Sequence, residues 1–188
     1  MEVTYKQRNT EKKGATTTMS PAEYVQNITP PELAAAPSPS TASFDKTDRS
    51  AGYTMEVVGA IRANDIAALQ YMLDNGTCFD VCNTNGEYLI HLACRRAQPE
   101  TVEFLLTQAG VRPDVRDTFG RTIFHDICWK STPDFDMMST VLRVTGRADL
   151  LLTKDIRGHQ PFDFARKHHW NQWMEFLVQN QDLFQQAQ

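Results

Sequence analysis

The chain has 188 residues, of which 41% are hydrophobic and 22% are charged, and its formal net charge is −4 at pH 7. This composition is typical of one modest globular domain. The chain has no run of about 18 apolar residues, which a membrane span requires, and its acidic balance without a dense Lys/Arg cluster argues against nucleic acid as a partner.

The amino-terminal residues and the cysteines indicate the compartment. Residues 1–6 read Met-Glu-Val-Thr-Tyr-Lys and contain no apolar segment of the kind that a secretory signal peptide needs. We therefore expect an intracellular protein, cytoplasmic or nuclear. In that compartment the four cysteines are expected to be reduced thiols: Cys78, Cys82, Cys94 and Cys128.

Residues 1–50 differ in composition from the rest of the chain. They hold five of the nine prolines, many Ser, Thr and Ala, and few large apolar side chains. Such a segment cannot recover the entropy lost on ordering, so we expect a disordered tail. Ser20-Pro-Ala-Glu23 is an exception, because it forms a capping box with proline at the first helical position. It predicts either a transient helical turn or a short helix that forms when a partner binds.

Residues 51–180 are predicted to form pairs of helices. In the first pair, apolar residues at helical spacing lie on both sides of Asn64-Asp65, which caps the second helix, and Asn75-Gly76 ends it. The following pairs are predicted at 90–96 with 100–107, at 123–129 with 137–144, and at 162–167 with 170–178. Residues 181–188 are expected to be a polar tail.

A pattern of turn, glycine and short apolar helix occurs three times in this region. The copies read Asn83-Thr-Asn-Gly86-Glu-Tyr-Leu-Ile-His91-Leu-Ala-Cys94, Asp117-Thr-Phe-Gly120-Arg-Thr-Ile-Phe-His125-Asp-Ile-Cys128, and Asp155-Ile-Arg-Gly158-His-Gln-Pro-Phe-Asp163-Phe-Ala165. Their glycines are 120 − 86 = 34 and 158 − 120 = 38 residues apart. A period of this size is typical of a stacked solenoid.

These copies resemble the ankyrin repeat family, in which Asp or Asn, two variable residues and Gly precede a run like Thr-Pro-Leu-His-x-Ala. Thr122 and Pro161 each match one column, and Asp163 stands where the other copies keep the family's histidine. The resemblance implies an all-α, ankyrin-type solenoid of about four repeats over residues 53–180. It also implies finger turns between repeats, and histidines that hydrogen-bond across them. The large apolar side chains of residues 170–178 are then expected to cover the open end of the stack.

The His and Cys residues are candidates for a catalytic or metal site. His91 with Cys94 and His125 with Cys128 have the count and type of a zinc ligand set. Neighbouring inner helices pack about 10 Å apart, however, whereas zinc needs all four ligands within about 2.3 Å of one point. A Cys/His nucleophile is disfavoured as well, because that helix face is expected to pack inward without water or an orienting acid. We therefore expect no metal, no cofactor and no enzymatic activity.

The resemblance instead implies a protein-binding module that acts as a scaffold or adaptor. The alternative is a regulatory or targeting subunit of an enzyme complex. Ankyrin partners dock on finger tips and on the exposed side of the inner helices. Carried over residue by residue, the candidate partner-binding residues are Phe119, Arg121, Trp129, Lys130, Arg95, Arg96, Arg157, His159 and Lys167.

This candidate surface is richer in basic residues than the chain around it. Residues 51–188 contain 13 basic and 17 acidic side chains, whereas the finger tips and the exposed sides of the inner helices together carry six basic ones and one acid, Glu87. We expect a monomer that binds an acidic protein segment with an aromatic or aliphatic anchor. Two alternatives stay open: the charges serve only to keep the repeat surface soluble, or Trp129 packs against the turn from Lys130 to Asp134 and is structural.

Overall fold

The computed structural model describes residues 19–31 and 52–184, and these residues form helices joined by turns. Three α-helical pairs come first in the repeat region: α3 (Met55–Ala63) with α4 (Ile66–Asp74), α5 (Leu89–Arg96) with α6 (Pro99–Thr107), and α7 (Ile123–Cys128) with α8 (Phe135–Thr145). The 3₁₀ helices η1 (Ala148–Leu152), η2 (Pro161–Phe164) and η3 (Lys167–His169) lead to α9 (Trp170–Gln179) and η4 (Gln181–Phe184). The described residues contain no strand, which confirms the all-α prediction.

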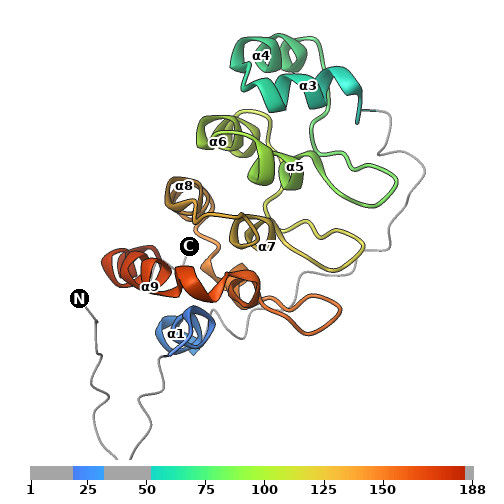
Figure 1. Cartoon of the computed structure of the whole chain (residues 1–188). Helices are drawn as coiled ribbons and strands as arrows, with labels where there is room; N and C mark the ends of the chain where they lie inside the picture. The colour runs from blue at the N-terminus through green and yellow to red at the C-terminus, as the bar shows by residue number, and fades with distance from the viewer. Residues whose placement is uncertain (1–18, 32–51, 185–188) are drawn as a thin grey trace, which may run out of the picture.

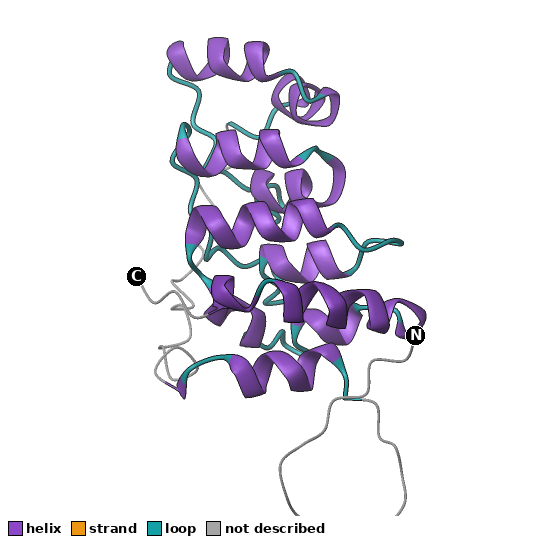
Figure 2. Cartoon of the chain, turned by 90° about the vertical axis from the view of Figure 1, so that its left-hand side faces the viewer, coloured by secondary structure: helices purple, strands orange, loops and turns teal. Residues whose placement is uncertain are grey.

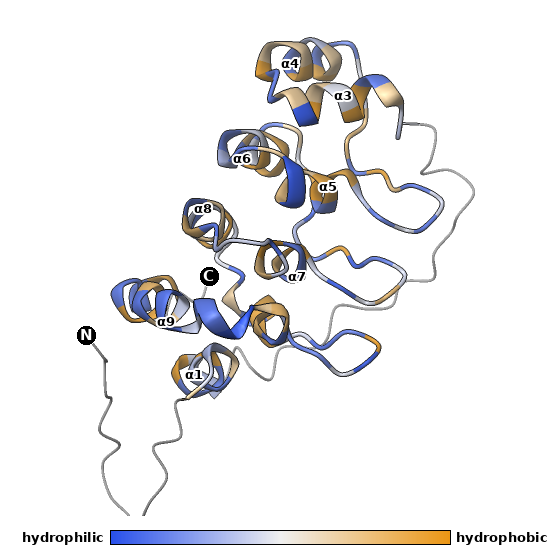
Figure 3. Cartoon of the chain, in the orientation of Figure 1, coloured by the Kyte–Doolittle hydropathy of each residue, from blue (hydrophilic) through white to orange (hydrophobic). Residues whose placement is uncertain are grey.

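The helical pairs stack in two layers. Figure 1 shows α3, α5, α7 and η2 in an inner layer and α4, α6, α8 and α9 in an outer one, with long turns projecting from the inner side. The outer helices run side by side in Figure 2. We call the three projecting turns, at residues 83–87, 117–121 and 155–159, fingers; they are largely hydrophilic in Figure 3. The fingers together with the exposed side of the inner helices form what we call the finger face.

Local sequence signals determine where the helices begin and end. Asp65 Oδ1 accepts a hydrogen bond from the N–H of Ala68 at 2.9 Å, and Asp134 Oδ1 accepts one from Met137 at 3.0 Å. Such N-caps satisfy amide groups that have no partner inside the helix. Gly146 ends α8 in the left-handed region, at φ 62°.

A continuous hydrophobic core runs between the two layers. Its fully buried side chains include one or more from each helical pair, so every repeat is held by its neighbours. Removing each such side chain from water contributes about 1.5–3 kcal/mol. The largest of them include Ile61, Leu69, Leu89, Ile90, Leu105, Ile123, Ile127, Phe162 and Trp173.

The fourth repeat differs from the prediction. A helix was expected over 162–167, but only η2 forms, and Ala165 is extended at φ −68° and ψ 129°. The indole N–H of Trp170 donates to the Ala165 carbonyl at 3.1 Å, so this carbonyl is satisfied without a further helical turn. The last inner helix is therefore one short 3₁₀ turn.

Helix α1 (Pro21–Ile28) lies inside the segment that was expected to be a disordered tail. It begins with the predicted capping box: Ser20 Oγ accepts from the N–H of Glu23, and a Glu23 carboxylate oxygen accepts from the N–H of Ser20. The helix packs against η1, η2 and α9, below the fourth repeat in Figure 1. The open end of the stack is thus covered by α1 as well as by α9.

The structure describes only part of each expected tail. Residues 1–18, 32–50 and 185–188 lie outside the described residues. Within 181–188, η4 forms and Phe184 is fully buried, which differs from the expected polar tail. Packing against α8 explains this burial. No helix of the described residues has the length and apolarity to cross a membrane.

Candidate functional site: the finger face

The three fingers share one hydrogen-bonded turn, built by an Asp or Asn side chain. Asp117 Oδ1 accepts from the N–H groups of Phe119 and Arg121, both at 2.9 Å. Asn83 and Asp155 make the equivalent pairs of bonds in the other fingers, at 2.8–3.1 Å. A short polar side chain that bonds to backbone two residues on is a typical turn former. This chemistry explains why each copy begins with Asp or Asn.

Gly120 occupies the position where the finger must turn back. Its φ is 73°, and Gly86 and Gly158 have φ 69° and 85° in the other fingers. This left-handed region is one that glycine adopts without steric cost, so the predicted positive φ is confirmed. A Cβ on Gly120 would lie 3.3 Å from the backbone nitrogen of Ile156, because the Ile156 N–H donates to the Phe119 carbonyl at 3.0 Å.

Buried histidines join each finger to the next. His91 Nε2 lies 3.1 Å from the carbonyl of Arg121, and His125 Nε2 lies 3.1 Å from that of His159. His125 Nδ1 accepts from the Thr122 N–H at 3.0 Å, so the ring proton is on Nε2, which donates to His159. Burial lowers the pKa of His125, and the ring is held neutral. The predicted hydrogen bonds across finger turns are confirmed.

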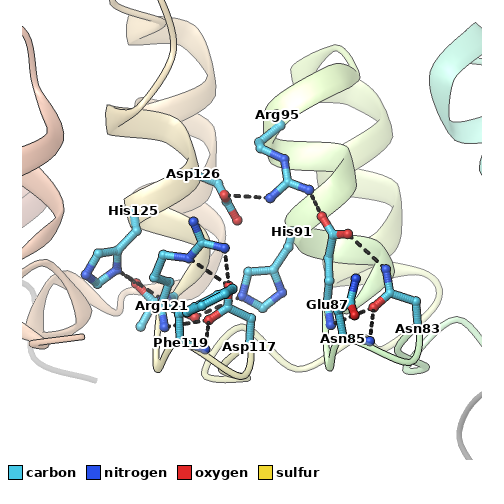
Figure 4. Close-up of polar contacts among 11 residues, drawn as sticks. Asn83, Asn85, Glu87, His91, Arg95, Asp117, Phe119, Arg121, His125 and Asp126 are labelled. Atoms are coloured by element: carbon cyan, nitrogen blue, oxygen red, sulfur yellow. Dashed lines mark hydrogen bonds and ion pairs between the residues drawn. The ribbon is translucent and has the colours of Figure 1, made fainter. Parts of the chain in front are cut away.

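Arg95 is held by two carboxylates and is not a free cation. Its guanidinium lies 2.8 Å from Asp126 Oδ1 on α7 and also pairs with Glu87 of the first finger, as Figure 4 shows. The side chain of Asp126 is only 1% exposed. A buried carboxylate without a cation is costly, so the first role of Arg95 is to neutralise Asp126 and to join the second repeat to the third.

Two further basic residues of the candidate set are also paired. Arg121 Nη2 lies 2.6 Å from Asp117, and Lys130 Nζ lies 2.6 Å from Asp134. Arg96, Arg157 and Lys167 are exposed, and within the described part of the chain no carboxylate pairs with them. The excess of positive charge on the finger face is therefore smaller than the sequence count suggested.

Phe119, Arg121 and Trp129 come together on the finger face. The guanidinium carbon of Arg121 lies 4.9 Å from the Phe119 ring centroid and 5.4 Å from that of Trp129. Both rings stay about half exposed, Phe119 at 48% and Trp129 at 52%. The ion pair with Asp117 fixes the guanidinium, so the two exposed rings have a rigid charged group between them.

Phe164 of the fourth repeat extends this group. Its ring stacks on Trp129 with centroids 5.9 Å apart at 24°, and it meets the His159 ring edge-on at 5.8 Å. We call Phe119, Arg121, Trp129, Phe164 and His159 the aromatic cluster. Trp129 thus packs on the next repeat, whereas the alternative considered from sequence was packing on the turn after Lys130.

A family comparison is consistent with this geometry. A model of ankyrin repeats in three copies matches residues 57–150, which is 94 of the 188 residues, or half the chain. The chain belongs to the ankyrin repeat family. No curated protein matches it.

Ankyrin repeats are generally protein-protein interaction modules, and the family is typically non-enzymatic. The matched residues end at 150, so the fourth repeat, with its shortened inner helix, lies beyond them. That departure agrees with the atypical sequences of terminal repeats in solenoids.

The two cysteines on the inner helices of this ankyrin domain, Cys94 and Cys128, are buried thiols. Cys94 and Cys128 are at most 2% exposed, and burial raises the pKa of both well above that of an ordinary thiol. Thiolate is the form that attacks electrophiles or binds metal. Within the described ranges no group of three or more His, Cys, Asp or Glu side chains is placed to hold a metal ion.

Two residues that contact side chains of the finger face, Asp126 and Phe164, were not predicted from the sequence. Asp126 interrupts the apolar run of α7. A buried acid needs a cationic partner, and this requirement could have identified Arg95 as its partner. Phe164 was not selected because it was assigned to the predicted inner helix, whereas η2 turns it toward Trp129. The structure brings Phe119, Arg121, Trp129 and His159 together, whereas Arg95 and Lys130 pair with Asp126 and Asp134.

Proposed function

We propose that this protein is a non-enzymatic scaffold or adaptor that binds a segment of another protein on its finger face. The observation that carries the proposal is the pair of half-exposed rings, Phe119 and Trp129, held on either side of Arg121. Trp, Tyr and Arg are the residue types that dominate the energy of protein interfaces. Here Phe119 and Arg121 lie on a hydrogen-bonded finger and Trp129 stacks on Phe164, so little side-chain entropy is lost on binding.

The chemistry of the cluster defines the partner segment. An aromatic or aliphatic side chain fits against the exposed rings of Phe119 and Trp129. Acidic residues beside this anchor would meet Arg157 and Lys167, which are exposed cations of the fourth repeat. Arg95, Arg121 and Lys130 are already paired within the chain. The charges of these three residues therefore contribute mainly to the rate of encounter with the partner.

We further propose that the protein acts as an intracellular monomer. The support for the location is that Cys94 and Cys128 are buried as free thiols. Reduced cysteines are usual inside cells.

A peptide selection tests the binding site. Random peptides displayed on phage are selected on the wild-type chain, and the enriched sequences are synthesised and titrated against the Trp129→Ala variant. Loss of a central anchor costs about 2 kcal/mol or more, which corresponds to about thirtyfold weaker binding. Tyr71→Ala is the matched control, because Tyr71 is a 71% exposed aromatic residue on α4, away from the finger face.

Circular dichroism of each variant separates binding from folding. We expect Trp129→Ala to keep its helical signal, Tyr71→Ala to bind as wild type, and the enriched peptides to carry an aromatic or aliphatic residue beside acids. Selected peptides that bind Trp129→Ala and wild type equally well would remove the aromatic cluster from the proposed site.

A further inference from the structure

The C-terminal end of the stack is a surface that receives an amphipathic helix. Helix α1 lies on it, against η1, η2 and α9, in the position where the next repeat of a solenoid would stack (Figure 1). Four residues of α1 are buried there: Pro21, Ala22, Tyr24 and Val25. Val25 is only 1% exposed, so this surface holds the apolar side of the helix closely.

Two glutamines of the repeat domain add directional contacts. Gln26 of α1 donates from its side-chain amide to Gln160 Oε1 at 2.6 Å. Gln160 is 7% exposed and donates in turn to the Leu152 carbonyl at 3.1 Å, so its orientation is fixed. Gln181 donates to the Tyr24 hydroxyl oxygen at 2.5 Å. The surface therefore selects a helix by shape and by neutral hydrogen bonds.

Charge has no part in this recognition. The only charged residue of α1 is Glu23, which is exposed and bonds to Ser20 in its own capping box. No salt bridge joins α1 to the rest of the described chain. This distinguishes the surface from the finger face, where exposed cations favour an acidic segment.

Helix α1 carries its own start and stop signals. The capping box at Ser20 and Glu23 begins it, and the Thr29 hydroxyl donates to the Val25 carbonyl at 2.7 Å where it ends. An isolated helix of eight residues is nonetheless unstable in water. Its order therefore depends on docking, and it is joined to the repeats only through residues 32–51.

We propose that the C-terminal end of the stack is a second docking site, for an uncharged amphipathic helix of a partner protein, and that α1 occupies it in cis. A tethered helix acts as an intramolecular competitor at high effective concentration. The partner helix has the pattern of α1: a capped start, small and aromatic or β-branched side chains on one face, and an amide to meet Gln160. When it binds, α1 is released.

A labelled peptide of residues 19–31 is the probe for this site. It is titrated by fluorescence anisotropy against the full wild-type chain and against full-length Val25→Asp, in which a charge at a buried position undocks α1. Asn27→Asp is the matched control, since it adds the same charge to the exposed side of α1. A peptide that itself carries the Val25→Asp change is the negative probe.

We expect the peptide to bind Val25→Asp. If α1 is docked in nine-tenths or more of the molecules, the peptide binds wild type and Asn27→Asp at least about tenfold more weakly. Raising the salt concentration leaves this binding unchanged, because no charges meet. Equal affinity for wild type and Val25→Asp, or no binding to Val25→Asp, overturns the proposal.

Hydrogen exchange provides a measurement that needs no variant. In the isotope-labelled wild-type chain, an excess of the unlabelled peptide is expected to displace α1, so the amides of Tyr24 to Ile28 lose protection while those of α5 to α8 keep it. Protection of α1 that is unchanged by saturating peptide would show that the helix is a fixed part of the fold, and the proposal would fail.

Discussion

The close approach of the second and third fingers at Gly120 gives a quantitative test of the repeat architecture. Gly120 and Gly158 both have positive φ, 73° and 85°, so alanine at either position costs about 1–2 kcal/mol for the left-handed conformation. A Cβ on Gly158 meets no heavy atom within 4 Å, whereas one on Gly120 lies 3.3 Å from Ile156 Cγ2 and from the Ile156 backbone nitrogen. Gly158→Ala therefore isolates the conformational cost.

The extra cost at Gly120 comes from a hydrogen bond between the fingers. To accommodate the new methyl group, the Ile156 backbone must move from its 3.0 Å hydrogen bond with the Phe119 carbonyl. Weakening that bond costs about 0.5–1.5 kcal/mol. We expect Gly120→Ala to lose about 2–3 kcal/mol in total and Gly158→Ala about 1–2 kcal/mol.

Urea unfolding followed by circular dichroism measures both losses. Alanine also restricts the unfolded chain, but this effect is the same at both positions and cancels in the comparison. The informative quantity is the difference between the two variants, which should be about 1 kcal/mol. Equal losses, or a larger loss for Gly158→Ala, would show that contact between the second and third fingers does not contribute to stability.

Three further predictions concern buried polar groups. Thr122→Val removes the hydroxyl beside His125 Nδ1 and should lower the free energy of unfolding in urea by about 1 kcal/mol; no loss would contradict this. Because burial lowers the pKa of His125, the unfolded chain takes up its proton first as the pH falls below about 6.5, and stability should then decrease by up to about 1.4 kcal/mol per pH unit. Urea titrations at pH 7, 6 and 5 should show a smaller decrease in His125→Gln than in wild type. Arg95→Met should cost about 2 kcal/mol, below the value for a fully buried pair because Arg95 is 27% exposed, and Asp126→Leu in the same chain should restore part of it.

The local parts of the fold were predictable because each has a local cause. The finger turns follow from residues such as Asp117 and Gly120, which lie in the same short turn, residues 117–121. The helix starts follow from capping residues such as Asp65. The stacking followed from the repeat itself, since copies of one pattern at a fixed period bury a shared core.

Interactions between distant residues were harder to predict. The capping box at Ser20 indicated a helix, but nothing near it in sequence showed that this helix packs against η1, η2 and α9 of the same chain. Counting basic residues on the finger face also overlooked their partners. Asp126 follows Arg95 by 31 residues and meets it only because the repeats stack.

The partner-binding residues remain a proposal. The structure places Phe119, Arg121 and Trp129 together, which the family pattern allowed but did not require. Phe164 joined them because η2 is short. A terminal repeat has a neighbour on one side only, and its sequence departs most from the family pattern. The fourth repeat was therefore the hardest to predict.

The contact of α1 with the last repeat also constrains how the chain reaches its folded state. Tyr24 and Gln181 are 157 residues apart in sequence, whereas the stacking contacts of a linear array join only neighbouring repeats. During synthesis α1 leaves the ribosome before any repeat, yet its docking surface is completed by α9 and η4, the last described elements to be made. The first described helix to be synthesised is therefore among the last to pack, and a truncation of the fourth repeat would also release this helix, which lies far from it in sequence.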